Sequence, residues 1–347
     1  MDEAAVGTRR TSGDEARTIQ SPSEPSLWRE FLRGFLRVLR ANPLTFIGFI
    51  LVLIISVVAL LVVLVPLVSS VILGHTVLVT PYDPNALSTD YGQPPSASHL
   101  LGTDNLGQDV FSRIVAALPL DLAIGFGITG FALLVGGGLG LVAGYWDEPR
   151  TLGGAVSVII LRITDVFLAF PSLVLALAIA ASLGRGTGPS MLAILLTWWP
   201  YYVRLARGEV LAVKHQPYVM AARAGGVSEV RILFRHVLRN LAEPLLVYYT
   251  LDVGTVIVTF STISFIGIGV PLGVPEWGSM VESYERFLLT LPWTVLSAGA
   301  AIFVTVLAFS LFGDGLRDIL DPRSRRALVQ AAVPSTLAAK VAAAAEA

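Results

Sequence analysis

Six long apolar stretches dominate the pattern of hydrophobic and polar positions along the chain. Each has roughly the 20 residues that a helix needs to cross the hydrocarbon core of a bilayer. The pattern therefore predicts an all-α polytopic membrane protein with six transmembrane helices. The stretches lie at about 44–66, 119–144, 155–182, 190–208, 244–267 and 291–313.

The segment before the first stretch has a different periodicity. Between residues 26 and 42, apolar side chains recur every three or four positions, and arginines occupy the other side of the helix that this spacing predicts. Such a helix suits the surface of an anionic leaflet, and a helix docked on a partner protein is the alternative. We therefore expect a cytoplasmic tail and amphipathic interfacial helix over 1–43, and the first transmembrane helix over 44–66.

The distribution of basic residues predicts the orientation of the chain. If the N-terminus is cytoplasmic, the outer segments contain three basic residues, Arg113, Arg185 and Arg286, whereas twenty of the 24 lysines and arginines lie in inner tails and loops. Cationic loops are translocated poorly across a membrane. Both termini should therefore be cytoplasmic (N-in/C-in), in a multi-pass protein of the cell membrane.

Two connecting segments are too long to be simple connectors. The extracytoplasmic segment 67–118 is rich in Pro, Gly, Asp and Ser, and we expect it to form a small cap on the outer face. Residues 119–326 contain a five-helix core with a cytoplasmic loop at 209–243, which ends at Pro244. The stretch 327–347 is an alanine-rich, low-complexity tail.

Composition narrows the possible chemistry. Hydrophobic residues make up 54% and charged residues 14% of the 347 positions, whereas a soluble domain carries about a quarter charged residues. The net charge of −1 indicates no basic surface for nucleic acid. The chain has no cysteine, and its four histidines never occur at His-x-x-x-His spacing, so we expect no metal site.

No motif for catalysis or for nucleotide binding is present. A phosphate-binding loop requires Gly-Lys-Ser/Thr, but Lys214 follows Val213 and Lys340 follows Ala339. Ser190 has no histidine at bilayer depth to activate its hydroxyl, so we expect it to cap its helix. We therefore expect no catalytic residue and no cofactor in this chain.

Small residues and prolines predict how the helices pack. Gly136, Gly140 and Gly144 recur at four-residue spacing in the second span. A helix face without side chains lets two backbones approach closely, so these glycines predict a helix–helix contact within the chain or across a dimer. Pro171 and Pro200 predict kinks or breaks in the third and fourth spans.

Carboxylates are rare within the spans. Asp252 lies well inside the fifth span, where a charge costs about 2.5–3.5 kcal/mol, so it should face protein or water. It can serve as a polar clamp to a neighbouring helix or as a substrate or proton site. Arg162 and Asp165 are three residues apart, so they can pair on one helix face.

A second candidate for the pathway follows the fifth span. The segment Glu276-Trp277-Gly278 comes after a Gly/Pro-rich break and can fold back toward the mouth of a pore. A solvated outer turn is the alternative. With Asp252, these three residues are the candidate pathway residues of the chain.

The cytoplasmic loop contains the sequence Tyr-Val-Met-Ala-Ala-Arg-Ala-Gly-Gly at 218–226. It predicts a short helix that ends at a glycine pair. Small side chains suit a helix that inserts closely into the groove of a partner protein. The alternative is an ordinary positively charged cytoplasmic loop.

This loop resembles the coupling motif of ABC importer permeases, in which Glu-Ala-Ala is followed by Gly and, about a dozen residues later, by Leu-Pro. Four positions match: Ala221, Ala222, Gly226 and Leu238. Two positions depart from it: Met220 stands where Glu is usual, and Arg239 where Pro is usual.

Five further motifs in the right order resemble the dipeptide/oligopeptide/nickel group of these permeases. They are Leu101 to Asp109 with Ser112-Arg113, Leu168 to Ser172, Ser264 to Gly269, Trp277-Gly278, and Gly313 to Asp318 with Leu320 to Arg323. Gln108 stands where Arg is usual. The long N-terminus and the six spans resemble the second, C-type permease of that group.

The resemblance implies a type I ABC importer permease fold and a non-enzymatic half-channel for di- or oligopeptides. It implies a second homologous permease in a heterodimer, two cytoplasmic ATPases that bind ATP and Mg, an extracytoplasmic binding protein, and contact with membrane lipid. The residues implied to couple to the ATPases are Tyr218, Met220, Ala221, Ala222, Arg223, Gly226 and Leu238. The alternatives are import of oligosaccharide or nickel by the same machinery or, in a different class, a self-contained secondary carrier or channel.

Overall fold

The computed structural model describes residue 39, residues 42–271 and residues 273–320. The predicted amphipathic helix over 26–42, apart from Leu39 and Asn42, and the alanine-rich tail lie outside the described residues. The described residues form helices and no strand. The helices are α2 (Pro43–Leu73), α3 (Val110–Tyr145), α4 (Leu152–Leu168), α5 (Ser172–Leu183), α6 (Thr187–Lys214), α7 (Pro217–Ala224), α8 (Glu229–Ile232), the π-helical turn η1 (Leu233–Val237), α9 (Leu238–Phe265), α10 (Trp277–Glu285) and α11 (Pro292–Leu320).

Four helices of the described part are long and apolar enough to cross a membrane: α2, α3, the continuous helix Glu229–Phe265, and α11. The number rises to five if the bent pair of α4 and α5 counts as one span. α6 is long enough, but a run of tryptophan, proline and tyrosine over 198–202 interrupts its apolar sequence. The polytopic helical membrane fold is therefore confirmed, while the count of six spans stays a prediction.

The stretch 155–182, predicted as one span with a kink or break at Pro171, consists of two helices. α4 and α5 meet at an angle of 85° across the short break between Leu168 and Ser172. Pro171 directly precedes α5 and has no backbone N–H with which to continue α4. The preceding residue is also disfavoured in the helical region. The proline therefore breaks this span.

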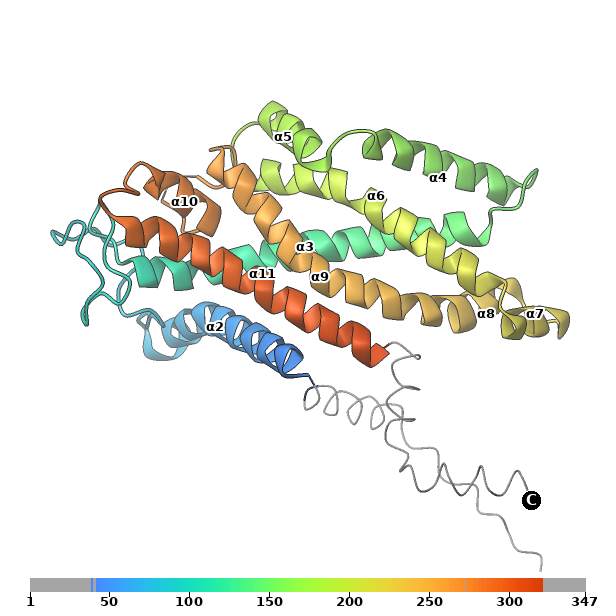
Figure 1. Cartoon of the computed structure of the whole chain (residues 1–347), viewed down its shortest axis with the longest axis horizontal. Coiled ribbons are helices and arrows are strands. Elements are labelled where there is room, and N and C mark those ends of the chain that lie inside the picture. Colours follow the sequence, from blue (N-terminus) through green and yellow to red (C-terminus); the bar gives the residue numbers. More distant parts are fainter. Residues whose placement is uncertain (1–38, 40–41, 272, 321–347) are drawn as a thin grey trace, which may run out of the picture.

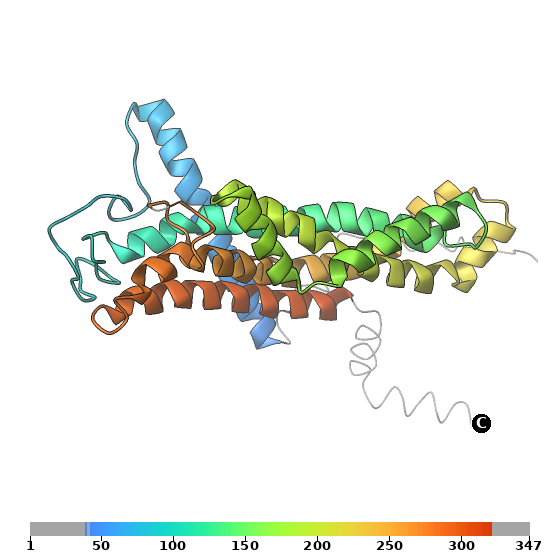
Figure 2. The ribbon, with the colours of Figure 1, turned by 90° about the horizontal axis from the view of Figure 1, so that it is seen from above.

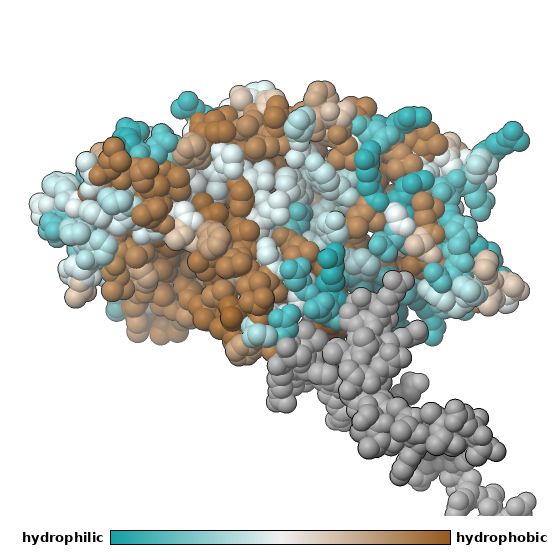
Figure 3. Space-filling model, in the orientation of Figure 1, coloured by the Kyte–Doolittle hydropathy of each residue, from teal (hydrophilic) through white to brown (hydrophobic). Residues whose placement is uncertain are grey.

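The long helices form an elongated bundle with a loop region at each end. α10 and the loop 74–109 lie at one end, and α7 and α8 lie at the other (Figure 1). α2 packs against α3 and α11, and it crosses the bundle obliquely (Figure 2). Apolar surface covers α2 and the adjoining part of α11, whereas polar surface marks the α7–α8 end (Figure 3). In the most apolar 18-residue stretch of α2, only 11% of the residues are buried.

The predicted glycine contact lies within the chain, between α3 and α6. A Cβ atom on Gly136 would collide with the carbonyl oxygen of Trp199, and one on Gly140 would lie 2.5 Å from the carbonyl oxygen of Val203. A Cβ atom on Gly144 would also collide with α6, at 2.8 Å from the Cβ atom of its neighbour there. The two backbones therefore touch over two helical turns, as expected for a stripe of small residues.

The outer segment is shorter than the predicted 67–118, because α2 extends to Leu73 and α3 begins at Val110. α3 starts early because the Asp109 carboxylate accepts the backbone N–H of Ser112 at 2.8 Å and caps the helix. The Arg113 guanidinium donates to the side-chain oxygen of Gln108 at 2.6 Å. These motif residues therefore hold the loop against the start of α3.

Candidate functional site

The predicted cytoplasmic loop 209–243 is mostly helical. α6 extends to Lys214, and α8 and η1 lead into α9 without interruption. Pro244 lies inside α9 rather than at the end of a loop, which corrects that prediction. Pro244 has no N–H to donate to the carbonyl of Asn240 one turn earlier, and Asn240 lines a cavity.

α7 has one buried face and one exposed face. Val219 is fully buried, and Ala222 packs against the hydrophobic core three residues later. Tyr218, Met220 and Ala221 are exposed. The predicted coupling residues are therefore divided between two faces: Tyr218, Met220 and Ala221 can meet a partner, whereas Ala222 anchors the helix to this chain.

The end of α7 depends on a glycine in a left-handed conformation. Gly226 has φ +77°, in contrast to Gly225 with φ −75°. The N–H of Gly226 donates to the carbonyl of Arg223 at 3.0 Å, and the N–H of Val227 donates to the carbonyl of Ala222 at 3.1 Å. This pair of bonds is the Schellman termination of a helix, which places glycine at the left-handed position.

Arg223 has a partner within the chain. Its Nε atom donates to a Glu229 carboxylate oxygen at 2.8 Å, and the Tyr145 hydroxyl at the end of α3 donates to the Glu229 carbonyl at 3.2 Å and to its carboxylate. The hydrogen bond to Glu229 raises the pKa of Arg223 above its ordinary value, with a smaller contribution from Tyr145. α7 is therefore tied to α8 and to the end of α3.

The remaining coupling candidate, Leu238, lies at the start of α9, and Lys214 ends α6. Leu238 packs against the hydrophobic core, and Arg239 beside it is exposed. Lys214 donates to the carbonyl of Gly144 at 3.0 Å and forms an ion pair with Asp147. The end of α6 is thus fixed to the end of α3, next to the connection to α7.

Asp252 links α9 to α6. Its Oδ2 atom accepts the indole N–H of Trp198 at 2.6 Å and the hydroxyl of Tyr202 at 3.1 Å. The same carboxylate lines a cavity of about 290 Å³, together with side chains of α5, α6 and α9. The interpretation as a clamp is therefore confirmed, and the carboxylate also borders open space.

The segment Glu276-Trp277-Gly278 is buried, so the alternative of a solvated turn is wrong. Trp277 and Glu276 have no exposed surface, and the Trp277 indole donates to the carbonyl of Ile114 at 3.1 Å. The Glu276 carboxylate accepts the backbone N–H groups of Gly278 and Ser279, both at 2.8 Å, and caps α10. These residues fix α10 against α3 and α9.

Sequence reasoning missed the partners of two carboxylates. Trp198 and Tyr202 were not assigned to Asp252, although their four-residue spacing places them on one face of α6. Asp165 pairs with Arg204 of α6 at 2.8 Å rather than with Arg162. Ser190 donates to the carbonyl of Ile268 at 3.3 Å, and α6 already begins at Thr187 behind Gly186. The proposed capping role of Ser190 is therefore wrong.

Within 42–271 and 273–320, no group of three or more histidine, cysteine, aspartate or glutamate side chains could hold a metal ion.

Comparison with known proteins gives consistent relatives. The chain is 39% identical over 267 residues to the dipeptide transport system permease protein DppC of Alkalihalophilus pseudofirmus, covering 75% of this chain and 86% of that protein. It is 42% identical over 244 residues to the probable D,D-dipeptide transport system permease protein DdpC of Escherichia coli K12, covering 70% and 80%. It is 35% identical over 307 residues to the glutathione transport system permease protein GsiD of Pectobacterium atrosepticum, covering 88% and 94%.

A solved structure of the MetNI methionine ABC transporter in inward-facing conformations aligns with a TM-score of 0.48 and 17% identity, covering 60% of this chain and 96% of that chain. The family of binding-protein-dependent transport system inner membrane components matches residues 136–326. Members of this family are transport permeases rather than enzymes, and they work with ATPase and binding-protein partners. This chain therefore belongs to that family, as a C-type permease of the dipeptide/oligopeptide group of ABC importers in the cell membrane.

Proposed function

We propose that this permease imports di- or oligopeptides that an extracytoplasmic binding protein delivers. The names of the relatives carry this proposal, because proteins 35–42% identical over most of the chain are permeases for dipeptides, D,D-dipeptides and glutathione. Import of oligosaccharide or nickel by the same machinery is the weaker alternative. The family also favours an importer subunit over a self-contained carrier.

The chain crosses the membrane six times, with both termini in the cytoplasm. α2, α3, the α4–α5 pair, α6, α9 and α11 supply the six crossings. The excess of basic residues in the inner segments supports this orientation. The exposed apolar side chains of α2 support contact with lipid along that helix.

The chain forms a heterodimer with a related permease, and two cytoplasmic ATPases bind the ATP and Mg that power transport. The exposed face of α7, with Tyr218, Met220 and Ala221, contacts an ATPase. The hydrogen bonds that join Arg223, Glu229 and Tyr145 support transmission of movement from α7 to α3. ATP binding would then favour one of two helix arrangements, as differential affinity requires.

The test is purification of the tagged chain in mild detergent, followed by uptake assays with the reconstituted complex. We expect a second permease and two ATPases to co-elute, and ATP-dependent accumulation of Ala-Ala when the binding protein is present. Maltotriose and Ni²⁺ serve as controls for the alternatives. Accumulation of either control without accumulation of Ala-Ala would refute the peptide assignment.

The orientation has its own test, because the chain lacks cysteine. Ser96→Cys in the outer loop should react with a membrane-impermeant maleimide in intact cells. Ser228→Cys in the α7–α8 turn should react only after the membrane is opened. The reverse pattern would contradict the proposed orientation.

A further inference from the structure

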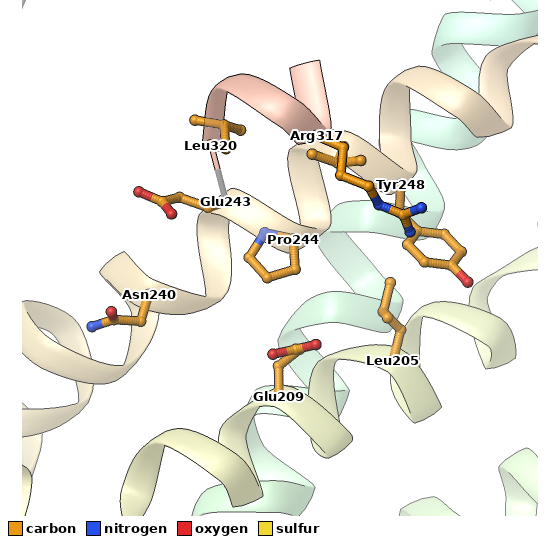
Figure 4. A pocket seen from close by; sticks show the side chains of 9 residues that line it. Leu205, Glu209, Asn240, Glu243, Pro244, Tyr248, Arg317 and Leu320 are labelled. Carbon is orange, nitrogen blue, oxygen red and sulfur yellow. The ribbon is translucent and has the colours of Figure 1, made fainter. Parts of the chain in front are cut away.

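Two cavities lie next to each other along the groove between α6 and α9. The first, of about 290 Å³, is lined by Asp252 and by aromatic side chains. The second, of about 360 Å³, lies nearer the ends of the same helices that adjoin α7 and α8, and Figure 4 shows the side chains that line it. Leu205 of α6 and Tyr248 of α9 line both cavities. The two cavities are therefore neighbours that share part of their walls.

The groove is acidic. Asp252 is the carboxylate of the first cavity, and Glu209 and Glu243 line the second, where Arg317 of α11 is the single cation among the described lining residues (Figure 4). Three carboxylates therefore lie along the two cavities against one guanidinium; Figure 4 shows the Glu243 side chain directed away from Arg317. A cationic group in either cavity would gain favourable electrostatic energy.

The two arginines of α6 form ion pairs with aspartates that lie outside the groove. Arg204 forms an ion pair with Asp165 of α4 at 2.8 Å, and Arg207 lies 3.8 Å from Asp147, which follows α3. Neither Asp165 nor Asp147 lines the two cavities. The positive charges of α6 are thus neutralised away from the groove.

The first cavity combines a carboxylate with aromatic rings. Trp198, Tyr201, Tyr202 and Tyr248 line it with Asp252. Both hydrogen bonds recorded for this carboxylate within the described residues end on Oδ2, so Oδ1 retains its capacity to accept. Aromatic faces attract an ammonium group, and a carboxylate oxygen accepts a strong, charge-assisted hydrogen bond from it.

We propose that the α6–α9 groove binds the ammonium group of the transported solute. Asp252 and the surrounding rings hold a solute that carries a free amine, and Glu209 and Glu243 receive the amine as it moves toward the cytoplasm. This inference rests on the proposed function as a peptide importer, because a peptide with a free N-terminus carries such an amine. It adds that the permease itself selects the charge of its cargo.

The first experiment measures uptake by the complete reconstituted importer with the same binding protein throughout. Asp252→Asn removes the charge but keeps an oxygen that can accept from Trp198 and Tyr202, so the helix clamp is preserved. We expect uptake of Ala-Ala to fall about tenfold, the size of one lost charged hydrogen bond. Stimulation of ATP hydrolysis by the loaded binding protein should persist.

Asp165→Asn is the matched control, because it removes a carboxylate that contacts α6 outside the groove. It should leave Ala-Ala uptake within about twofold of the unmodified importer, as expected for an exposed ion pair. If Asp252→Asn also stays within that range while the unmodified importer accumulates Ala-Ala, the ammonium site is refuted and the peptide function stands.

The second experiment detects occupancy without transport. Thr255 lines the first cavity, and Thr255→Cys creates a single thiol in this cysteine-free chain. In the complete complex, Ala-Ala-amide, which carries a free amine, should slow maleimide labelling of this chain, whereas neutral N-acetyl-alanine amide should not. Adding Asp252→Asn should abolish the protection.

Protection by Ala-Ala-amide without any peptide uptake would support the ammonium site and refute the peptide function. Equal protection by both amides would refute the ammonium site.

Discussion

The two sides of α6 differ in how they meet their neighbours. Against α3, the contact is made by backbone, with Gly140 pressed against the carbonyl of Val203 and no room for a side chain. Against α9, the contact is made by side chains, with Trp198 and Tyr202 reaching to Asp252 beside an open cavity. The glycine stripe leaves no gap toward α3, whereas a cavity opens toward α9 beside the hydrogen bonds to Asp252.

This difference indicates which contacts move during transport. Close packing of the two backbones leaves no room for α3 and α6 to move relative to each other, so they should shift as one rigid body. Side-chain bridges across a groove can break and reform, so the distance between α6 and α9 can change. Because α6 leads into α7, Tyr145 joins α3 to Glu229 of α8, and α8 continues into α9, a push on α7 reaches α6, α3 and α9.

The largest effect should come from the connection between α7 and this rigid pair. Gly226→Val places a β-branched residue at φ +77°, which costs about 1–2 kcal/mol and favours a different end for α7. We expect ATP-driven uptake to be abolished while the protein remains inserted and assembled. Gly225→Val is the control, because φ is −75° there and a Cβ atom meets its nearest atom at an ordinary 3.4 Å. Normal ATP-driven uptake by the Gly226→Val variant would show that α7 does not transmit energy from the ATPases.

The close contact between α3 and α6 can be disrupted by adding one methyl group. Gly140→Ala forces α3 and α6 apart and should lower the stability of the protein in detergent by about 1–3 kcal/mol, as overpacking does. Gly138→Ala, on the same helix, has nothing within 4 Å of its new Cβ atom, so it should be neutral or slightly stabilising. Thermal unfolding measures both, and equal melting temperatures would contradict the closed contact.

The bridged side should be less sensitive. Asp252→Ala leaves the Trp198 indole and the Tyr202 hydroxyl without their acceptor, but the neighbouring cavity lets water replace part of the loss. We expect a loss of about 1 kcal/mol in the same thermal assay, and Asp252→Asn should recover most of it. A loss larger than that of Gly140→Ala would reverse the comparison between the two sides.

The smallest effect should come from the exposed ion pair of α6. The side chains of Arg204 and Asp165 are 60% and 48% exposed, so solvent screens their attraction. Arg204→Ala should change the stability by about 0.5 kcal/mol or less. A double-mutant cycle with Asp165→Ala measures the pair directly, and a coupling energy well above that value would mean that this contact also holds α6 in place.

Local patterns in the sequence predicted the local features of this fold. The apolar stretches located α2, α3, α9 and α11, the glycine spacing located the α3–α6 contact, and the glycine pair located the end of α7. Each of these depends on neighbours in the chain or on the absence of a side chain, which can be read directly from the residues.

Contacts between distant residues could not be predicted in the same way. The donors to Asp252 are 50 and 54 residues away in the chain, and nothing local distinguishes Arg204 from Arg162 as the partner of Asp165. The burial of Trp277 depends on α3, more than 150 residues earlier. The 85° bend at Pro171 was foreseen as a kink, but its size depends on how α5 packs against α6.

The central claim is that this chain is half of a pathway and takes its energy from other subunits through α7. Vesicles that contain the chain alone, and vesicles that contain the complete importer, can be compared for uptake of Ala-Ala with binding protein outside and ATP inside. The account predicts accumulation above the external concentration only with the complete importer, and its loss with Gly226→Val. Accumulation by the chain alone, driven by an ion gradient, would contradict it.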